Sequence, residues 1–234
     1  MQPYRSSLAL QPLALLQGLA QTRLEQLAQQ CLWQSIPAGK PLLLRSEDKS
    51  DIYFLVRGKL RVTTYSVNGR QVTFRDLSNG EHFGEIAAID GGPRSADVVT
   101  LVPSVVAILD RPAFLELLRD EPLVAERVMR GLAALVRQLS ERVIDLSTFG
   151  VQHRLHAELM RLAKAAGIAG NRARLEPAPT HAHLASRIST GREQITRELN
   201  ALMRDGLLAK EAKALVVLDA ERLERLVREV RGAG

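Results

Sequence analysis

The sequence has one cysteine, no long run of apolar residues and no recognisable set of catalytic side chains. The single cysteine among 234 residues, Cys31, excludes an intramolecular disulfide, a four-cysteine zinc site and an iron–sulfur cluster held by the cysteines of one chain. A lone thiol fits a reducing compartment, where it is most simply a small buried apolar residue. We therefore expect a cytoplasmic protein.

No segment is apolar enough to cross a membrane, which takes roughly 18 consecutive apolar residues. The best candidate, residues 8–19, is interrupted by Gln11, Pro12 and Gln17. A secretory signal peptide needs an unbroken apolar stretch after a charged start, and Arg5 is the only early charge. The sequence thus predicts neither a membrane partner nor a signal peptide, and a short helix packed on the first domain is the simpler interpretation.

Patterns typical of catalytic and metal sites are also missing. No nucleophile, base and orienting group stand in an arrangement that covalent catalysis requires, so we do not expect an enzyme. His153 and His156 lie three residues apart and His181 and His183 two apart, but no clustered carboxylates or cysteines accompany them. We expect these histidines on solvated faces, and we predict no metal site and no cofactor.

Positive charge is concentrated in the last third of the chain. Residues 1–148 carry 17 Lys and Arg against 16 Asp and Glu, whereas residues 149–234 carry 15 against 10. The overall net charge of +6 therefore rests mainly on the C-terminal part. Such an excess favours a polyanion as the partner of that part.

The residue pattern changes along the chain, of which 46% is apolar and able to form a core. Residues 1–36 are predicted to be helical because leucines recur at helical spacing until Pro37 and Gly39 end the pattern. Residues 42–109 contain short β-branched or aromatic runs separated by Gly-containing turn signals, which predicts an antiparallel sandwich or barrel.

A long helix is predicted over residues 123–149. Its apolar residues follow a near-heptad rhythm, namely Val128, Leu132, Leu135, Leu139, Val143 and Leu146. A seam this narrow needs a partner helix, most simply the same helix of a second copy, so we expect a homodimer. The alternative is that the seam packs on the β domain of its own chain. Gly150 then interrupts the helix and is a natural hinge.

Short elements are predicted for the remainder. Asp110 is expected to cap a helix before the long one, with Pro112 in its first turn. After the hinge we expect a helix to residue 166, a loop over 167–179, two short helices over 180–206 and a hairpin over 207–218. Asp219 is expected to cap a closing helix.

Residues 83–96 form a motif suited to a phosphate. Gly84 allows a close approach of the backbone, and one helical turn after Glu85 would direct N–H groups at an anion. Arg94 offers a bidentate cation, Ser95 a hydroxyl donor, and Glu85 an acceptor for a sugar hydroxyl. Each residue taken alone is compatible with a β-turn carrying surface charge, but the joint spacing favours a ligand.

Residues 180–199 have the pattern of a helix-turn-helix. Thr180 can cap the first helix, and Ile195 and Leu199 form the core face of the second. The outer face of the second helix carries Arg192, Glu193, Thr196 and Arg197, which include side chains that read guanine and cytosine edges. The alternative is a solvated face with a Glu193–Arg197 pair. The adjacent hairpin and the positive charge favour DNA.

Both motifs resemble those of the cyclic-AMP receptor protein family, bacterial transcription factors grouped with the fumarate–nitrate regulators. The resemblance covers nearly the whole chain and implies an α+β fold. It places an N-terminal, jelly-roll-like cyclic-nucleotide-binding β-roll in residues 1–122, a dimerisation helix and hinge in 123–149, and a C-terminal winged helix-turn-helix in 150–234. The implied partners are double-stranded DNA, a cyclic mononucleotide, a second copy of the chain and RNA polymerase.

The resemblance also implies site residues. In that family the cassette holds the ribose and the cyclic phosphate, and the ligand-binding positions here are Gly84, Glu85, Ile86, Ala87, Arg94 and Ser95, together with Val62, Arg75, Leu77, Leu139 and Ser140. An Arg-Glu pair followed by a second Arg reads a TGTGA-type half-site in the family, and Arg192, Glu193 and Arg197 match it. The other implied DNA-binding residues are Thr180, Ser186, Arg187, Thr190, Gly191 and Thr196.

Three positions depart from the family pattern. Leu139 replaces a threonine that bonds the adenine amino group, before Ser140, which weakens selectivity for cyclic AMP. Arg75 stands near the base, where it could favour the acceptors of guanine or be a solvated strand residue. Gly191 replaces a serine at the start of the recognition helix, which removes one phosphate contact, and Thr190 is expected to take over the capping.

The sequence therefore predicts a homodimeric transcription regulator controlled by a cyclic mononucleotide, with cyclic AMP ahead of cyclic GMP, that binds a TGTGA-type palindrome. One alternative keeps the DNA-binding fold but changes the effector to a cyclic dinucleotide or to none. Another is a cyclic-nucleotide-binding module that acts on a protein partner. The intact Glu85 and Arg94 argue against the bulkier dinucleotide, and the helix-turn-helix argues against the protein-directed module.

Overall fold

The chain divides into two compact units in the computed structural model, which describes residues 6–66, 69 and 71–231. The first unit comprises Met1–Tyr65 and Thr73–Val136, and the second comprises Ser66–Val72 and Arg137–Gly234. The long helix α5 (Pro122–Thr148) contributes to both units, whereas the sequence predicted residues 123–149 as a segment of its own. Within the described ranges, no helix is long and apolar enough to cross a membrane.

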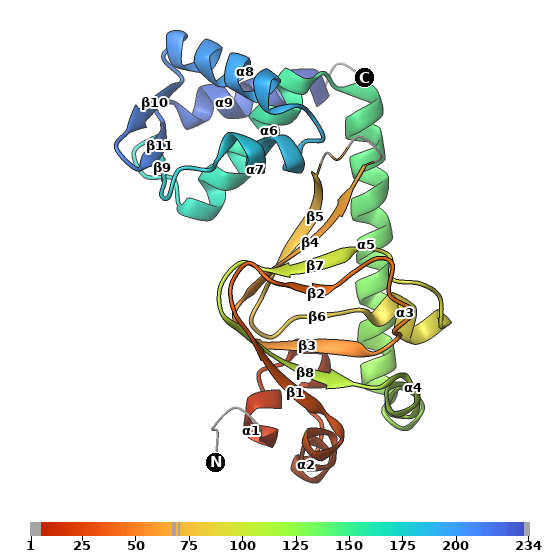
Figure 1. Cartoon of the computed structure of the whole chain (residues 1–234). Helices are drawn as coiled ribbons and strands as arrows, with labels where there is room; N and C mark the ends of the chain where they lie inside the picture. The colour runs from red at the N-terminus through yellow and green to blue at the C-terminus, as the bar shows by residue number, and fades with distance from the viewer. Residues whose placement is uncertain (1–5, 67–68, 70, 232–234) are drawn as a thin grey trace. The chain divides into compact units, whose positions relative to one another are not determined.

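Two four-stranded sheets form the body of the first unit (Figure 1). Their strand orders are β1-β8-β3-β6 and β2-β7-β4-β5, and antiparallel pairs join β8 to β1 and β3, and β7 to β2 and β4. The strands are β1 (Leu32–Ile36), β2 (Pro41–Leu43), β3 (Ile52–Arg57), β4 (Lys59–Tyr65), β5 (Gln71–Ser78), β6 (His82–Phe83), β7 (Asp97–Thr100) and β8 (Ser104–Leu109). The predicted β-roll is confirmed.

The N-terminal segment corrects one prediction. It contains α1 (Ser7–Leu10), a 3-10 turn at Ala14–Leu16 and α2 (Gln21–Gln30), but residues 32–36, expected to be helical, form strand β1. Trp33 and Ile36 are buried there, and the strand pairs with β8, whose Ser104 lies opposite Ile36. A pairing partner this distant in sequence leaves no local signal, so the helical leucine pattern was extended too far.

Two apolar clusters stabilise the first unit. One lies between the two sheets and includes Leu55, Leu60 and Val106. The other joins α1, α2 and α4 (Arg111–Asp120) to the sheet that contains β3 and β8, and it includes Cys31. Burial raises the pKa of the Cys31 thiol to about 12, which agrees with its predicted role as a small apolar residue. The predicted cap of α4 is confirmed, because Asp110 accepts from the Ala113 N–H at 2.9 Å.

Helix α5 shows a different apolar face from the one predicted. Val128 is 3% exposed and packs in the core of the first unit, so its assignment to a dimer interface is wrong. Seven apolar residues of α5 are 40–62% exposed: Leu123 and Ile144, and also Met129, Val136, Leu139, Val143 and Leu146. The last five lie on one side of the helix. With the partly buried Leu132 they keep a strict 3-4-3-4-3 spacing, and we call these six residues the heptad face. Leu135 lies beside it.

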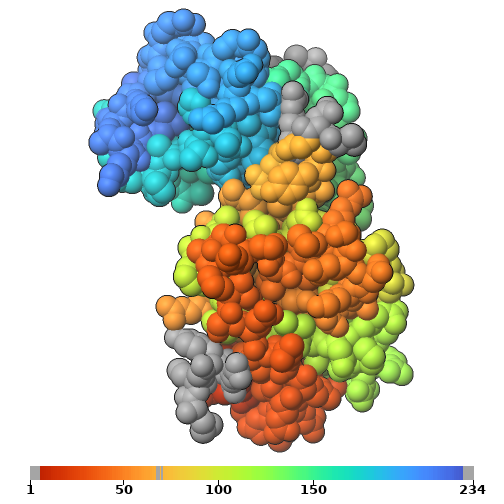
Figure 2. Space-filling view, in the orientation of Figure 1, coloured from red at the N-terminus to blue at the C-terminus, as the bar shows by residue number. Residues whose placement is uncertain are grey.

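The second unit packs its helices on a small sheet of order β10-β11-β9 (Figure 1). Its elements are α6 (Val151–Ala166), β9 (Ala173–Leu175), α7 (His181–Arg187), α8 (Arg192–Arg204), β10 (Leu208–Glu211), β11 (Ala214–Val217) and α9 (Ala220–Arg231). Strand β9 interrupts the predicted loop over 167–179. The hairpin is confirmed, and so is the cap of α9, because Asp219 accepts from the Arg222 N–H at 2.8 Å. In the space-filling view α8 and the hairpin form the blue surface of this unit (Figure 2).

Two histidines of α6 are buried, which corrects the expectation of a solvated face. His153 is 7% exposed and its ring centroid lies 4.5 Å from that of Phe149. His156 is 5% exposed. Its pKa lies below the ordinary value because burial disfavours the charged imidazole and His153 adds repulsion, while the Glu198 carboxylate opposes both.

The low pKa of His156 predicts that acid destabilises the fold. As the pH falls below the ordinary histidine value of 6.5, the unfolded chain takes up a proton before the folded chain does, so stability is lost toward the folded-state pKa. His156→Gln should lose less stability than the wild type over this interval. Thermal melts at about pH 7.5 and about pH 5.5 measure the difference. Equal losses in both proteins would contradict the prediction.

Candidate anion site and nucleic-acid interface

Gly84 brings the backbone into close contact with Arg94 between β6 and α3 (Glu85–Asp90). It has φ +83°, a conformation that L side chains rarely adopt. A Cβ at this position would lie 2.8 Å from Nη1 of Arg94 and 3.0 Å from the carbonyl oxygen of Asp51. Both the conformation and the space therefore require glycine here, and the predicted helical turn follows it.

Arg94 is a buried cation with unused donors. The residue is 3% exposed, and its guanidinium carbon lies 5.4 Å from the ring centroid of Tyr53. Nη1 donates to the carbonyl oxygens of Asp51 at 2.9 Å and Gly84 at 3.2 Å. Nε and Nη2 are buried without a hydrogen-bond partner, and no carboxylate of the described residues forms an ion pair with the side chain. A buried, uncompensated guanidinium is costly unless an anion completes the site.

Acidic and basic groups gather around His82, in the strand that leads into Gly84. Glu85 is 9% exposed in the first turn of α3. The pKa of His82 lies below its ordinary value because burial disfavours the charged ring; Glu85 acts in the opposite direction, and Arg75 adds to the lowering. Arg75 donates from Nη2 to the carbonyl oxygen of His82 at 3.4 Å and places Nη1 3.7 Å from Glu81. Arg75 is therefore tied to the strand that leads into Gly84.

The other predicted ligand-binding residues differ widely in solvent exposure. Ser95 is exposed, Ile86 and Val62 are partly buried, and Ala87 is buried. Leu77 has no exposed surface and packs between the two sheets, so its side chain is not available to a ligand in this structure, contrary to the prediction. Leu139 and Ser140 are exposed on the part of α5 that belongs to the second unit.

The second unit contains the predicted helix-turn-helix. Thr180 caps α7 by accepting from the His183 N–H at 3.1 Å, as expected. Helix α8 exposes Arg192, Glu193 and Arg197. Within the described residues no Glu193–Arg197 ion pair is formed, and Arg197 donates to Gln194 instead. The outer face of α8 thus presents two guanidinium groups and a carboxylate.

The structure differs from two predicted phosphate contacts, Ser186 and Arg187, and from the predicted capping role of Thr190. Ser186 is 4% exposed and its hydroxyl donates to the carbonyl oxygen of His183 at 2.8 Å. The side chain of Arg187 is 16% exposed and lies 3.3 Å from Glu158. Thr190 does not cap α8, because Gly191 is the N-cap and no side chain bonds there. Ser186 therefore bonds within its own helix, and Arg187 pairs with a carboxylate of α6.

Thr196 is also engaged within the protein. Its hydroxyl donates to the carbonyl oxygen of Arg192 at 3.1 Å. Nδ1 of His181 lies 2.8 Å from the hydroxyl oxygen of Thr196. His181 therefore links the start of α7 to the outer face of α8.

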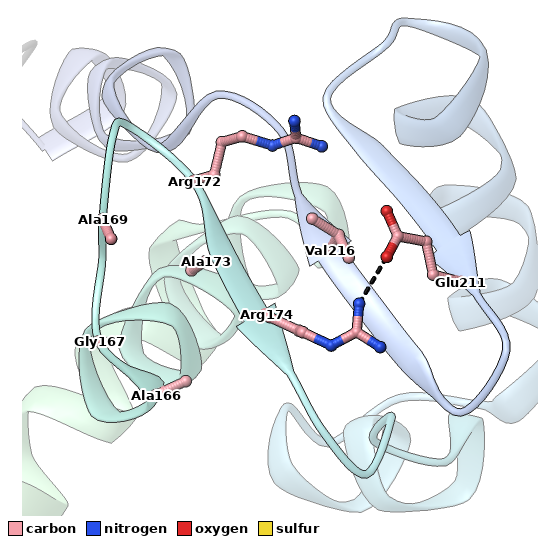
Figure 3. Close-up of a pocket in the computed structure, with 8 residues that line it drawn as sticks. All are labelled: Ala166, Gly167, Ala169, Arg172, Ala173, Arg174, Glu211 and Val216. Carbon is pink, nitrogen blue, oxygen red and sulfur yellow. Dashed lines mark hydrogen bonds and ion pairs between the residues drawn. The ribbon is translucent and has the colours of Figure 1, made fainter.

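A shallow depression of about 440 Å³ lies on the sheet of the second unit, outside both predicted sites (Figure 3). Its floor includes Ala173 and Val216, and Arg174 extends across it (Figure 3). Arg174 is neutralised by Glu176 at 2.9 Å and by Glu211. Among the described residues, no group of three or more His, Cys, Asp or Glu side chains could hold a metal ion.

Sequence reasoning missed several contributors to these sites. Asp51 and Tyr53 hold Arg94 from β3 and the residue before it, and no sequence spacing connects them to the cassette. Met129 and Val136 were missed on α5, although their seven-residue spacing to Val143 was a readable signal.

Each of the two units contains a segment that matches a known protein family. Residues 33–121 match the family model described as cyclic nucleotide-binding domain, and residues 153–226 match the Crp-like helix-turn-helix domain. A CRP-like cAMP-activated global transcriptional regulator of Mycobacterium tuberculosis is 25% identical over 91% of this chain and 95% of its own length. The cyclic AMP receptor protein of Thermus thermophilus is 29% identical over 81% of this chain and 85% of its own.

A solved structure supports the fold as well. The c-di-GMP responsive global regulator of Xanthomonas campestris is similar with a TM-score of 0.73, covering 82% of this chain and 95% of that chain, at 20% sequence identity. The fold and the two matched domains define a DNA-binding transcription regulator with a cyclic nucleotide-binding domain. The chain belongs to the family of the cyclic-AMP receptor protein and the fumarate–nitrate regulators. The Mycobacterium relative is named a transcriptional regulator, and the Xanthomonas protein is named a global regulator that links cell–cell signalling to virulence gene expression.

Proposed function

We propose that the chain is a homodimeric transcription regulator that a cyclic mononucleotide switches, and that it binds a TGTGA-type palindrome in double-stranded DNA. Its effector is cyclic AMP or cyclic GMP, it uses no other cofactor, and it acts in the cytoplasm, where it contacts RNA polymerase. The observation that carries the proposal is the buried guanidinium of Arg94, whose Nε and Nη2 have no hydrogen-bond partner within the part of the chain that the structure describes.

A cyclic phosphate fits this cradle better than a neutral ligand does. Nε and Nη2 of one guanidinium can donate together to two oxygens of an anion. Gly84 removes the side chain that would occupy the space beside Nη1. The buried Glu85 offers an acceptor for a ribose hydroxyl on the same α3 segment. Charge, space and an adjoining acceptor are therefore provided by one short stretch of chain.

The heptad face of α5 supports the dimer. Its a positions are Met129, Val136 and Val143, and its d positions are Leu132, Leu139 and Leu146. β-Branched residues at a positions with leucine at d positions favour a parallel coiled coil of two helices. A parallel dimer would supply two α8 helices, as a palindrome requires, about 34 Å apart.

The effector is identified by calorimetric titration of the purified protein with cyclic AMP, cyclic GMP and cyclic di-GMP. We expect micromolar binding of one mononucleotide. Tight binding of cyclic di-GMP alone would contradict the proposed effector. The effector would then be the one named for the Xanthomonas regulator. No binding of any of the three would remove the nucleotide switch and leave the DNA-binding part of the proposal.

Arg192→Ala tests the DNA-reading assignment. Arg192 is exposed at the start of α8, where a guanidinium can donate to both acceptors of a guanine. We expect specific affinity to fall by about 1–3 kcal/mol, with effector affinity unchanged. Gel-shift titrations on the palindrome and on an unrelated duplex at one salt concentration measure this. If the discrimination between the two duplexes survives, α8 is not the reading helix.

A further inference from the structure

The turn between α7 and α8 is held by arginines from two other helices. Nη2 of Arg142, on α5, donates to the carbonyl oxygen of Arg187 at 3.1 Å and to Oγ of Ser189 at 3.4 Å. Nε of Arg154, on α6, donates to the carbonyl oxygen of Ile188 at 3.1 Å. Two successive carbonyl groups at the entry to the turn are therefore bonded to two different helices.

These two arginines lie on opposite sides of the break between α5 and α6. Gly150 is extended there, with φ −63° and ψ 165°, and it caps α6. Arg154 also donates from Nη1 to the carbonyl oxygen of Phe149 at 2.6 Å. One guanidinium thus joins the hinge peptide to the helix-turn-helix turn. A change of the angle at Gly150 must either break these bonds or move the turn.

The surroundings of the turn leave it little freedom. Ser189 has φ +56°, which residues other than glycine seldom adopt without support from their contacts. The side chain of Arg187 lies 3.3 Å from Glu158, which also accepts two hydrogen bonds from Arg161 at 2.7 and 2.8 Å. Glu158 is 8% exposed, so the carboxylate at the centre of this network is largely screened from solvent, while the Arg161 side chain is half exposed.

Charge alone does not explain the position of Arg142. Its pKa lies below the ordinary value because burial and the positive charge of Arg187 disfavour its cation, while the Glu158 carboxylate opposes them. The guanidinium is nevertheless directed at main-chain and hydroxyl oxygens, which a planar fork of donors suits. The geometry therefore indicates a role in fixing the backbone of the turn.

We propose that Arg142 and Arg154 are positioning residues. Through their hydrogen bonds, the position of the turn between α7 and α8 depends on the angle between α5 and α6, and the position of the start of α8 follows that of the turn. The proposal rests on the proposed function only in taking α8 as the DNA-reading helix. Contacts to base edges require placement to within about 0.5 Å, so a released turn weakens specific binding before it weakens binding to phosphates.

The test compares Arg142→Gln with Arg137→Gln, an equal loss of charge at an exposed position of the same helix. Two DNA probes are used. The first is a duplex that the wild-type protein selects from a random pool, and the second is a duplex of unrelated sequence. The affinity of each variant for both probes is measured at one salt concentration. We expect Arg142→Gln to lose about tenfold or more of its affinity for the selected duplex. Its affinity for the unrelated duplex should change no more than that of Arg137→Gln. Equal effects of the two variants on both duplexes overturn the proposal.

A second variant covers the case in which Arg142→Gln does not fold, as judged by thermal melting. Arg142→Lys keeps the charge but lacks the planar fork, and we expect it to fold and to lose several-fold of the selected-duplex affinity. Unchanged affinity in Arg142→Lys would overturn the proposal in that case. Failure of the proposed function is distinguishable, because the wild type itself would then select no duplex from the pool.

Discussion

Replacing Arg94 with Met is expected to abolish cyclic-nucleotide binding while leaving the unliganded protein at least as stable as the wild type. Hydrogen bonds to charged groups contribute about 1.5–3 kcal/mol each, so losing two of them lowers affinity by roughly 100-fold or more. The unliganded protein loses the two bonds from Nη1 and the contact with the Tyr53 ring, and it is relieved of a buried guanidinium that has no counterion among the described residues. Apolar residues of similar size often replace such buried ions without loss of stability.

Calorimetry and thermal melting together check this prediction. In the wild type, bound effector should raise the melting temperature by linkage, and in Arg94→Met this rise should disappear. Arg119→Met, at the end of α4, serves as a control for the loss of one surface cation. Retained affinity in Arg94→Met would mean that the ligand does not use this guanidinium.

Replacing Val143 with Glu should convert the dimer to a monomer. Val143 is an a position of the heptad face and is 62% exposed in the single chain, so the substitution leaves the core of the chain intact. In a parallel dimer the two new carboxylates would meet in one layer, where desolvation and repulsion oppose association. We expect the dimer dissociation constant to rise by at least about 100-fold, which corresponds to about 2.7 kcal/mol.

Sedimentation equilibrium measures the change, and Gln138→Glu provides the matched control. Gln138 is exposed on the same helix but outside the heptad face, so it adds the same charge without entering the predicted interface. Affinity for a palindrome should fall with dimerisation, because two half-sites bound by linked domains reinforce each other by about 10²- to 10⁴-fold. A dimer that survives Val143→Glu would place the interface on another surface.

Local patterns in the sequence were sufficient for most elements. The cap residues Thr180 and Asp219 form the expected bonds, and the hairpin and both helices of the helix-turn-helix occur where predicted. Gly84, Glu85 and Arg94 are brought together as their spacing indicated. These features depend on neighbours within about ten residues, where helix periodicity, capping and turn chemistry operate.

Tertiary contacts decided what the sequence pattern left open. Arg187 looks like a surface donor in sequence, but its partner, the Glu158 carboxylate, is set by how α6 and α7 pack. Ser186 is buried and bonds to the His183 carbonyl group of its own helix. His153 and His156 are buried as well. Their spacing of three residues is equally compatible with a solvated helix face, so the sequence alone did not reveal their burial.

The amino-acid sequence was enough to predict an anion-binding motif at residues 83–96 and a helix-turn-helix at residues 180–199. Each of these signals lies within a short stretch of chain and consists of several residues. Only the tertiary structure decided which apolar residues of α5 face outward, since Val128 and Met129 differ by a single position and the neighbouring core selects Val128. Tertiary contacts also leave Arg94 without a counterion among the described residues and direct Arg142 at the turn before α8. Each of these depends on groups distant in sequence, whose approach no periodicity encodes.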